Sequence, residues 1–145
     1  MPSTSPISPL NTKVTGQAAT GEARFTIKGD HLTITTHAQA VPPNIIHWQH
    51  LHGFADARSA ACPTDAADAN GDGIVDLMET ASMAQMTMVP LHDDTVSLEI
   101  PRDTYPKALA NGTLQYRKTI SLSALQKRSL RRSRARSWIS IGECS

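Results

Sequence analysis

Residues 68–79 crowd four carboxylates and two glycines into twelve positions, and like charges this close repel one another unless a cation lies among them. Oxygen donors stand at positions 1, 3, 5, 7, 9 and 12 of this stretch, the seventh through its backbone carbonyl: Asp68, Asn70, Asp72, Ile74, Asp76 and Glu79. Gly73 holds position 6, where such a loop turns sharply. The spacing predicts an EF-hand-type loop that binds Ca²⁺.

The alternative is a surface turn rich in Asp, Asn and Gly that binds nothing. A plain turn, however, has no need of Glu79 eleven residues after Asp68, so the pattern favours the calcium loop. At position 8 stands the apolar Val75, which we expect to anchor the loop to a core.

The flanks of the loop differ from those of a paired calcium sensor. Leu77 to Ala84 is good helix material and predicts a short exit helix. On the entry side Pro63 interrupts the segment, so we expect little more than one helical turn, from Pro63 to Ala67. The sequence shows no second loop of this kind. This arrangement favours a structural ion over a signalling one.

Charge is divided unevenly along the chain. Residues 1–126 hold eight basic and twelve acidic side chains, whereas residues 127–145 hold six basic and one. At 145 residues the chain suits one domain, and its aromatic content of 4% implies a core built from aliphatic side chains and methionine. No apolar run approaches the roughly 20 residues that span a bilayer, so no membrane span is predicted.

The N-terminal residues 1–20 carry neither a basic start nor an apolar core segment, and we expect a disordered arm rather than a secretory signal. The cysteines, Cys62 and Cys144, leave the compartment open. They could pair in an exported protein, and two free thiols in a reducing compartment fit equally well.

Short segments of alternating or β-branched residues recur from Gly21 to Leu122 and predict an antiparallel β-sandwich or barrel. Ala23 to Ile27 and Leu32 to Thr36 flank Gly29-Asp30, a two-residue hairpin signal. Further strands are expected over residues 45–52, 86–91, 95–100 and 112–122.

The C-terminal residues 127–145 are interpreted in three ways. A capping box at Ser123 to Gln126 predicts the start of a helix, and a basic run from Lys127 to Arg136 follows. That run is a nucleic-acid or anionic-surface patch, a solvated disordered end, or a non-native segment produced by truncation or a frameshift.

Histidines mark a second candidate site. On a strand, His50 and His52 share one face and could bind copper or zinc, while His47 points to the other face; His92 is a third candidate ligand. The alternative is that these are ordinary hydrogen-bonded histidines that bind no metal. The methionines Met83, Met86 and Met88 are interpreted as core filler rather than as copper ligands.

The segment from about residue 21 to 125 resembles bacterial β-sandwich proteins related to the chordin-type (CHRD) domain, which is itself similar to Cu/Zn superoxide dismutase. The resemblance is carried by short motifs distributed over the segment: Gly29 to Thr35, Pro42-Pro43-Asn44, His47-x-x-His50-x-His52-Gly53, Cys62-Pro63-Thr64, the stretch Asp68 to Gly73, and Met88 to Asp94.

The resemblance implies a sandwich over residues 21–126 with an inserted calcium loop, and it maps copper ligation onto His50 and His52. It also suggests an exported or periplasmic protein. No histidine follows His92, however, and the basic tail stands where related members carry their last strands. We therefore expect a non-enzymatic calcium-binding module, with a copper- or zinc-dependent, dismutase-like protein as the alternative. No substrate, protein partner or oligomeric state follows from the sequence.

Overall fold

The computed structural model describes residues 2–54 and 56–133, and in these the chain is mainly β, with antiparallel sheets and few helices. The elements follow in the order β1 (Ser3–Ile7), α1 (Thr12–Thr15), β2 (Thr20–Lys28), β3 (His31–Gln39), β4 (His50–Gly53), η1 (Asp65–Ala67), α2 (Leu77–Thr80), β5 (Met86–Pro90), η2 (Thr95–Ser97), β6 (Leu114–Ser121) and α3 (Leu122–Ser133). None of the helices in this part of the chain is long and apolar enough to cross a membrane.

The hairpin of β2 and β3 confirms the turn predicted at Gly29-Asp30. Lys28 pairs with His31, so the two strands are joined by two residues. Gly29 has φ of +58°, a conformation that glycine adopts without steric cost. Along β3, Leu32 and Ile34 point inward and are buried, as the alternation predicts.

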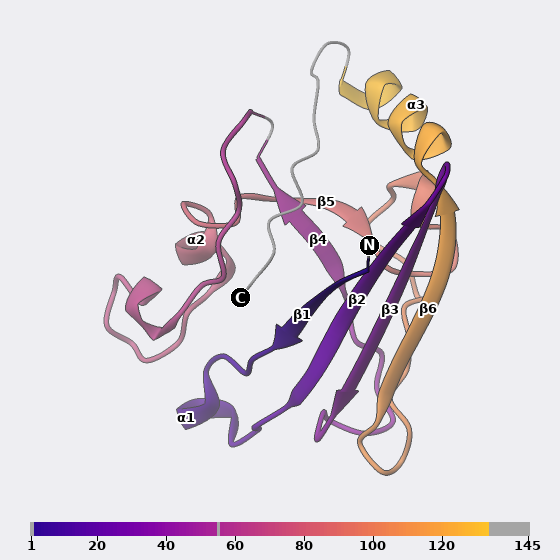
Figure 1. Ribbon diagram of the computed structural model, residues 1–145. Coiled ribbons are helices and arrows are strands. Elements are labelled where there is room, and N and C mark those ends of the chain that lie inside the picture. Colours follow the sequence, from indigo (N-terminus) through magenta and orange to yellow (C-terminus); the bar gives the residue numbers. More distant parts are fainter. Residues whose placement is uncertain (1, 55, 134–145) are drawn as a thin grey trace.

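Two sheets make up the described β structure, one with the order β1-β2-β3-β6 and one formed by β4 and β5 (Figure 1). The main core joins both sheets to η2 and α3, with the buried residues Leu32, Ile34, Val89, Leu91, Leu98, Ile120 and Leu125. A smaller cluster of Ala38, Val41, Ala108 and Leu114 closes the other end of β3 and β6.

Residues 3–7 were expected in a disordered arm but form β1, which pairs with β2 over five residues from Ser3↔Phe25 to Ile7↔Gly21. Pro6 is compatible with this position because an edge strand leaves one row of backbone N–H groups without a ladder partner. Ile7 also packs against the smaller cluster. The arm was misassigned because its composition is polar, whereas its order comes from pairing with a strand.

The prediction of a strand over residues 95–100 is also wrong. Thr95–Ser97 forms the short helix η2 instead, and Leu98 has φ of +60°. The Thr95 hydroxyl donates to the His92 carbonyl at 3.1 Å, and the Ser97 hydroxyl donates to the Asp94 carbonyl at 2.7 Å. Such local bonds from side chain to backbone compete with a strand ladder.

The end of β6 runs directly into α3, so residues 127–133, which were assigned to the tail, are helical. The helix was predicted, but it begins two residues earlier, because the Ser121 hydroxyl rather than that of Ser123 caps it, accepting from the Ala124 N–H at 3.0 Å. Leu125 is buried in the main core and holds the first turns in place. The rest of the basic run, residues 134–136, lies outside the described part of the chain.

Candidate functional site

The acidic loop begins with a tight turn around Asp68. Its carboxylate accepts from the Gly71 N–H at 2.7 Å and from the Gly73 N–H at 2.9 Å, one bond to each oxygen. Gly71 and Gly73 have φ of +77° and +83°, so the chain can coil around the side chain at these two points without strain. The predicted turn at position 6 is present.

The next ligand-type residues repeat this arrangement along the loop. Asn70 Oδ1 accepts from the Asp72 N–H, and Asp72 Oδ1 accepts from the Ile74 N–H, both at 2.8 Å. Asp76 caps α2, since its Oδ1 accepts from the N–H groups of Met78 at 2.7 Å and Glu79 at 3.0 Å. Each carboxylate has about four lone-pair sites, so these bonds orient the side chains without exhausting their capacity as acceptors.

Glu79 closes the loop. Its Oε1 accepts from the N–H groups of Ala69 at 2.9 Å and Asn70 at 3.2 Å, across ten and nine residues, and its Oε2 accepts from the Asp76 N–H at 3.0 Å. Position 12 of the loop therefore lies against positions 2 and 3. This contact brings the two ends of the acidic segment together.

Val75 anchors the middle of the loop, as expected from its apolar side chain, which is only 6% exposed. Its backbone is held by a residue that the sequence did not suggest. Asn11 Oδ1 accepts from the Val75 N–H at 2.7 Å, and Asn11 Nδ2 donates to the Val75 carbonyl at 3.0 Å. Because 64 residues separate the two, no spacing rule could have found this pair.

The flanking helices are shorter than in a helix–loop–helix unit. The entry helix is reduced to η1, within the Pro63–Ala67 stretch that was expected to form about one turn. The exit helix α2 ends at Thr80 rather than continuing to Ala84. Leu77 and Met78 are 69% and 79% exposed, so little apolar packing extends α2.

Over residues 2–54 and 56–133, no group of three or more His, Cys, Asp and Glu side chains is arranged to hold a metal ion. In the loop this follows from the partners just described: each carboxylate faces backbone N–H groups rather than a common centre. The donor set still suits calcium, which takes oxygens from carboxylates, amides and backbone carbonyls. Convergence on an ion requires Glu79 to exchange its backbone partners for the ion.

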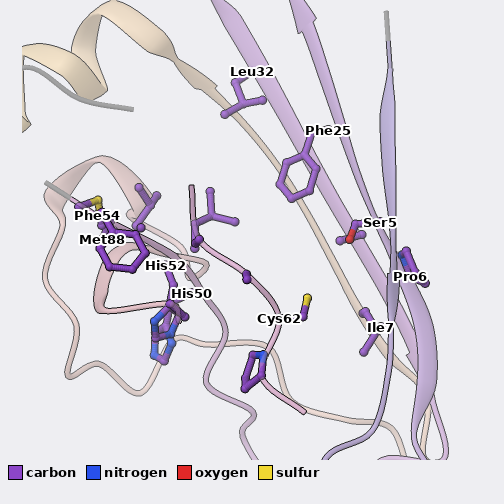
Figure 2. A pocket seen from close by; sticks show the side chains of 18 of the residues that line it. Ser5, Pro6, Ile7, Phe25, Leu32, His50, His52, Phe54, Cys62 and Met88 are labelled. Atoms are coloured by element: carbon purple, nitrogen blue, oxygen red, sulfur yellow. The ribbon is translucent and has the colours of Figure 1, made fainter. Parts of the chain in front are cut away.

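A second candidate region is an apolar cleft of about 710 Å³ between the two sheets. Figure 2 shows Ile7, Phe25 and Leu32 on the side of the larger sheet, with His50, His52, Phe54 and Met88 on the opposite side. Both histidines line the cleft, with ring centroids 5.7 Å apart, but so does Leu51 between them, because the β4–β5 pairing shifts between Leu51 and His52.

The three candidate histidines differ in how their ring nitrogens are engaged. Burial, together with the nearby His52, lowers the pKa of His50 below its ordinary value and favours the neutral imidazole. His92, the third candidate ligand, is fully buried, and both its ring nitrogens are engaged, with the Glu99 carbonyl at 2.7 Å and the Asp94 N–H at 3.0 Å. The copper or zinc hypothesis stays a prediction.

Of the remaining candidates, Met88 and Cys62 line the same cleft as the histidine pair, whereas His47 does not. His47 Nε2 lies 2.8 Å from the Pro42 carbonyl and does not join the histidine pair. Met88 lines the cleft and packs against the main core, as the interpretation of the methionines as filler predicts. Cys62 lines the cleft and is disulfide-bonded, whereas Cys144 lies outside the described residues.

Comparison of the chain with protein-family models, with curated proteins and with solved structures gave no match.

Proposed function

We propose that this protein is a calcium-binding module in which the ion is structural rather than catalytic. The supporting observation is the contact of Glu79 with the backbone of Ala69 and Asn70, which brings position 12 of the acidic loop back to positions 2 and 3. In the proposal, calcium becomes the shared partner of the carboxylates and relieves their mutual repulsion.

The proposed ligands are Asp68, Asn70, Asp72, Asp76 and Glu79 through their side chains and Ile74 through its carbonyl. The structural role is favoured by the position of the loop, which lies in the long connection between β4 and β5. That connection has few buried apolar side chains, Val75 among them, so an ion would supply cross-links that packing does not.

We also propose that the two facing sheets form a β-sandwich of the CHRD and superoxide dismutase type, with the calcium loop as an insertion. The antiparallel sheets and the core shared between them support this assignment. The motif resemblance supports the family, and it suggests a secreted protein.

Thermal unfolding with and without calcium tests the proposed function. An ion that binds only the folded state adds RT ln(1 + [Ca²⁺]/Kd) to the free energy of unfolding, about 2.7 kcal/mol at a hundredfold excess over Kd. For a chain of this size we expect the melting temperature to rise by about 8 °C and to return to its starting value with a chelator.

The double variant Asp68→Ala/Glu79→Ala should lose this shift. The matched control, Glu22→Ala/Asp103→Ala, makes the same change in charge outside the loop and should keep it. A melting temperature that is the same for metal-free and calcium-loaded wild-type protein contradicts the proposal.

A further inference from the structure

Asn11 connects the N-terminal strand to the acidic loop. It stands four residues after the end of β1, where it precedes α1 with φ of +59°. Its carboxamide makes two hydrogen bonds with Val75, so both backbone polar groups of position 8 are satisfied by one side chain. Asn11, Asp68, Gly73 and Val75 also line a small cavity of about 130 Å³, which places Asn11 directly beside the loop.

The geometry of this pair leaves little freedom for the loop. A planar carboxamide that both donates and accepts fixes the orientation of the Val75 peptide groups, not only their position. Ile74 and Asp76, the ligand-type residues at positions 7 and 9, are the chain neighbours of Val75. Orienting Val75 therefore restricts the backbone that presents both of them.

The same contact reaches β1. This edge strand pairs with β2, and with residues 60–63 it lines the apolar cleft (Figure 2). Figure 1 shows α1 and the loop on the same side of the molecule, beyond the end of β1. An ion that orders the loop would thus also restrain the far end of the segment that carries β1.

We propose that Asn11 is a positioning residue for the calcium loop and couples calcium binding to the docking of β1 on β2. This inference rests on the proposed function. Because such coupling is reciprocal, β1 docking strengthens calcium binding by the same factor by which calcium stabilises docking.

The decisive variant is Asn11→Gly, because glycine accepts the positive φ and removes only the carboxamide. Calcium affinity is measured by titration calorimetry, and docking of β1 by hydrogen exchange of the backbone amides in β1 and β2. Loss of two neutral hydrogen bonds should weaken calcium binding by about tenfold. In the wild type, calcium should slow exchange of the β1–β2 amides by about tenfold, and Asn11→Gly should abolish this slowing.

Asn44→Gly is the matched control, since Asn44 also has a positive φ, +63°, and lies in another turn. It should leave the calcium affinity and the slowing unchanged, whereas a merely destabilising role of Asn11 would change exchange equally with and without calcium. If the wild type binds calcium and Asn11→Gly binds it equally well, the inference is overturned while the proposed function stands.

If Asn11→Gly binds calcium more weakly but calcium still slows exchange of its β1–β2 amides as in the wild type, the coupling to β1 is overturned. Should Asn11→Gly fail to fold, the wild-type exchange decides: calcium binding that leaves β1–β2 exchange unaltered contradicts the inference. If the wild-type protein binds no calcium, the proposed function itself is contradicted.

Discussion

Single carboxylates in this protein connect stretches of backbone that are distant in sequence. Glu79 does so within the loop, and Asp30 does so for the larger sheet. The Asp30 carboxylate accepts from the hydroxyls of Ser121 at 2.6 Å and Ser123 at 2.8 Å and from the Ser123 N–H at 2.9 Å. It thereby joins the β2–β3 turn to the start of α3, more than ninety residues away.

The contact of Asp30 predicts a specific dependence of stability on pH. The hydrogen bonds from Ser121 and Ser123 hold the pKa of Asp30 below its ordinary value of 3.8. The contribution of the Asp30 carboxylate to the free energy of unfolding is therefore complete above the ordinary pKa of 3.8. It is lost as the pH falls through the lower pKa of the folded state. Urea unfolding of Asp30→Asn at pH 7 and pH 3 should show a smaller loss of stability on acidification than the wild type.

Asp103→Asn is the control, because it makes the same change in charge away from this contact. Equal acid sensitivity of the wild type and Asp30→Asn would show that the hydrogen-bonded carboxylate of Asp30 contributes nothing to stability.

Among the elements, β2 is one of the two strands in the larger sheet with a neighbour on each side, since it pairs with both β1 and β3. Gly21 lies where the three strands meet, paired with Ile7 and Ala38. A Cβ atom at Gly21 would stand 2.1 Å from the His37 carbonyl oxygen and 2.8 Å from the Ala38 Cα. Backbone atoms cannot move aside as a flexible side chain can, so this position requires glycine.

Gly21→Ala is accordingly expected to destabilise the protein by about 1–3 kcal/mol, the usual cost of overpacking, as measured by urea unfolding. Gly53→Ala in β4 is the matched control, because the three nearest atoms to a Cβ there all belong to the flexible Met88 side chain, the closest being its sulfur at 3.4 Å. Equal stability of the two variants would contradict the close approach of β2 and β3 at Gly21.

Elements with local signals could be predicted, and elements that depend on distant contacts could not. The β2–β3 hairpin follows from alternation around Gly29-Asp30, because turn chemistry acts over a few residues. By contrast, β1 has a polar composition and gains its order from β2. The sequence predicts a strand over residues 95–100, but hydrogen bonds from the Thr95 and Ser97 side chains to nearby backbone carbonyls stabilise η2 instead.

Across the described residues, the chain forms two antiparallel sheets that share a core, and residues of both line an apolar cleft of about 710 Å³. The acidic loop is tied through Asn11 to the segment that follows β1. The ligand-type residues of the loop could be predicted because their spacing is a property of twelve adjacent positions. The Asn11–Val75 contact could not, since it exists only once the chain is folded.

Calcium bound per chain, measured by equilibrium dialysis of the metal-free protein against buffered Ca²⁺, tests the central claim most directly. We predict saturation at one calcium ion per wild-type chain and none for Asp68→Ala/Glu79→Ala. Wild-type protein that retains no more calcium than the double variant, at any concentration up to the millimolar range, would contradict the account.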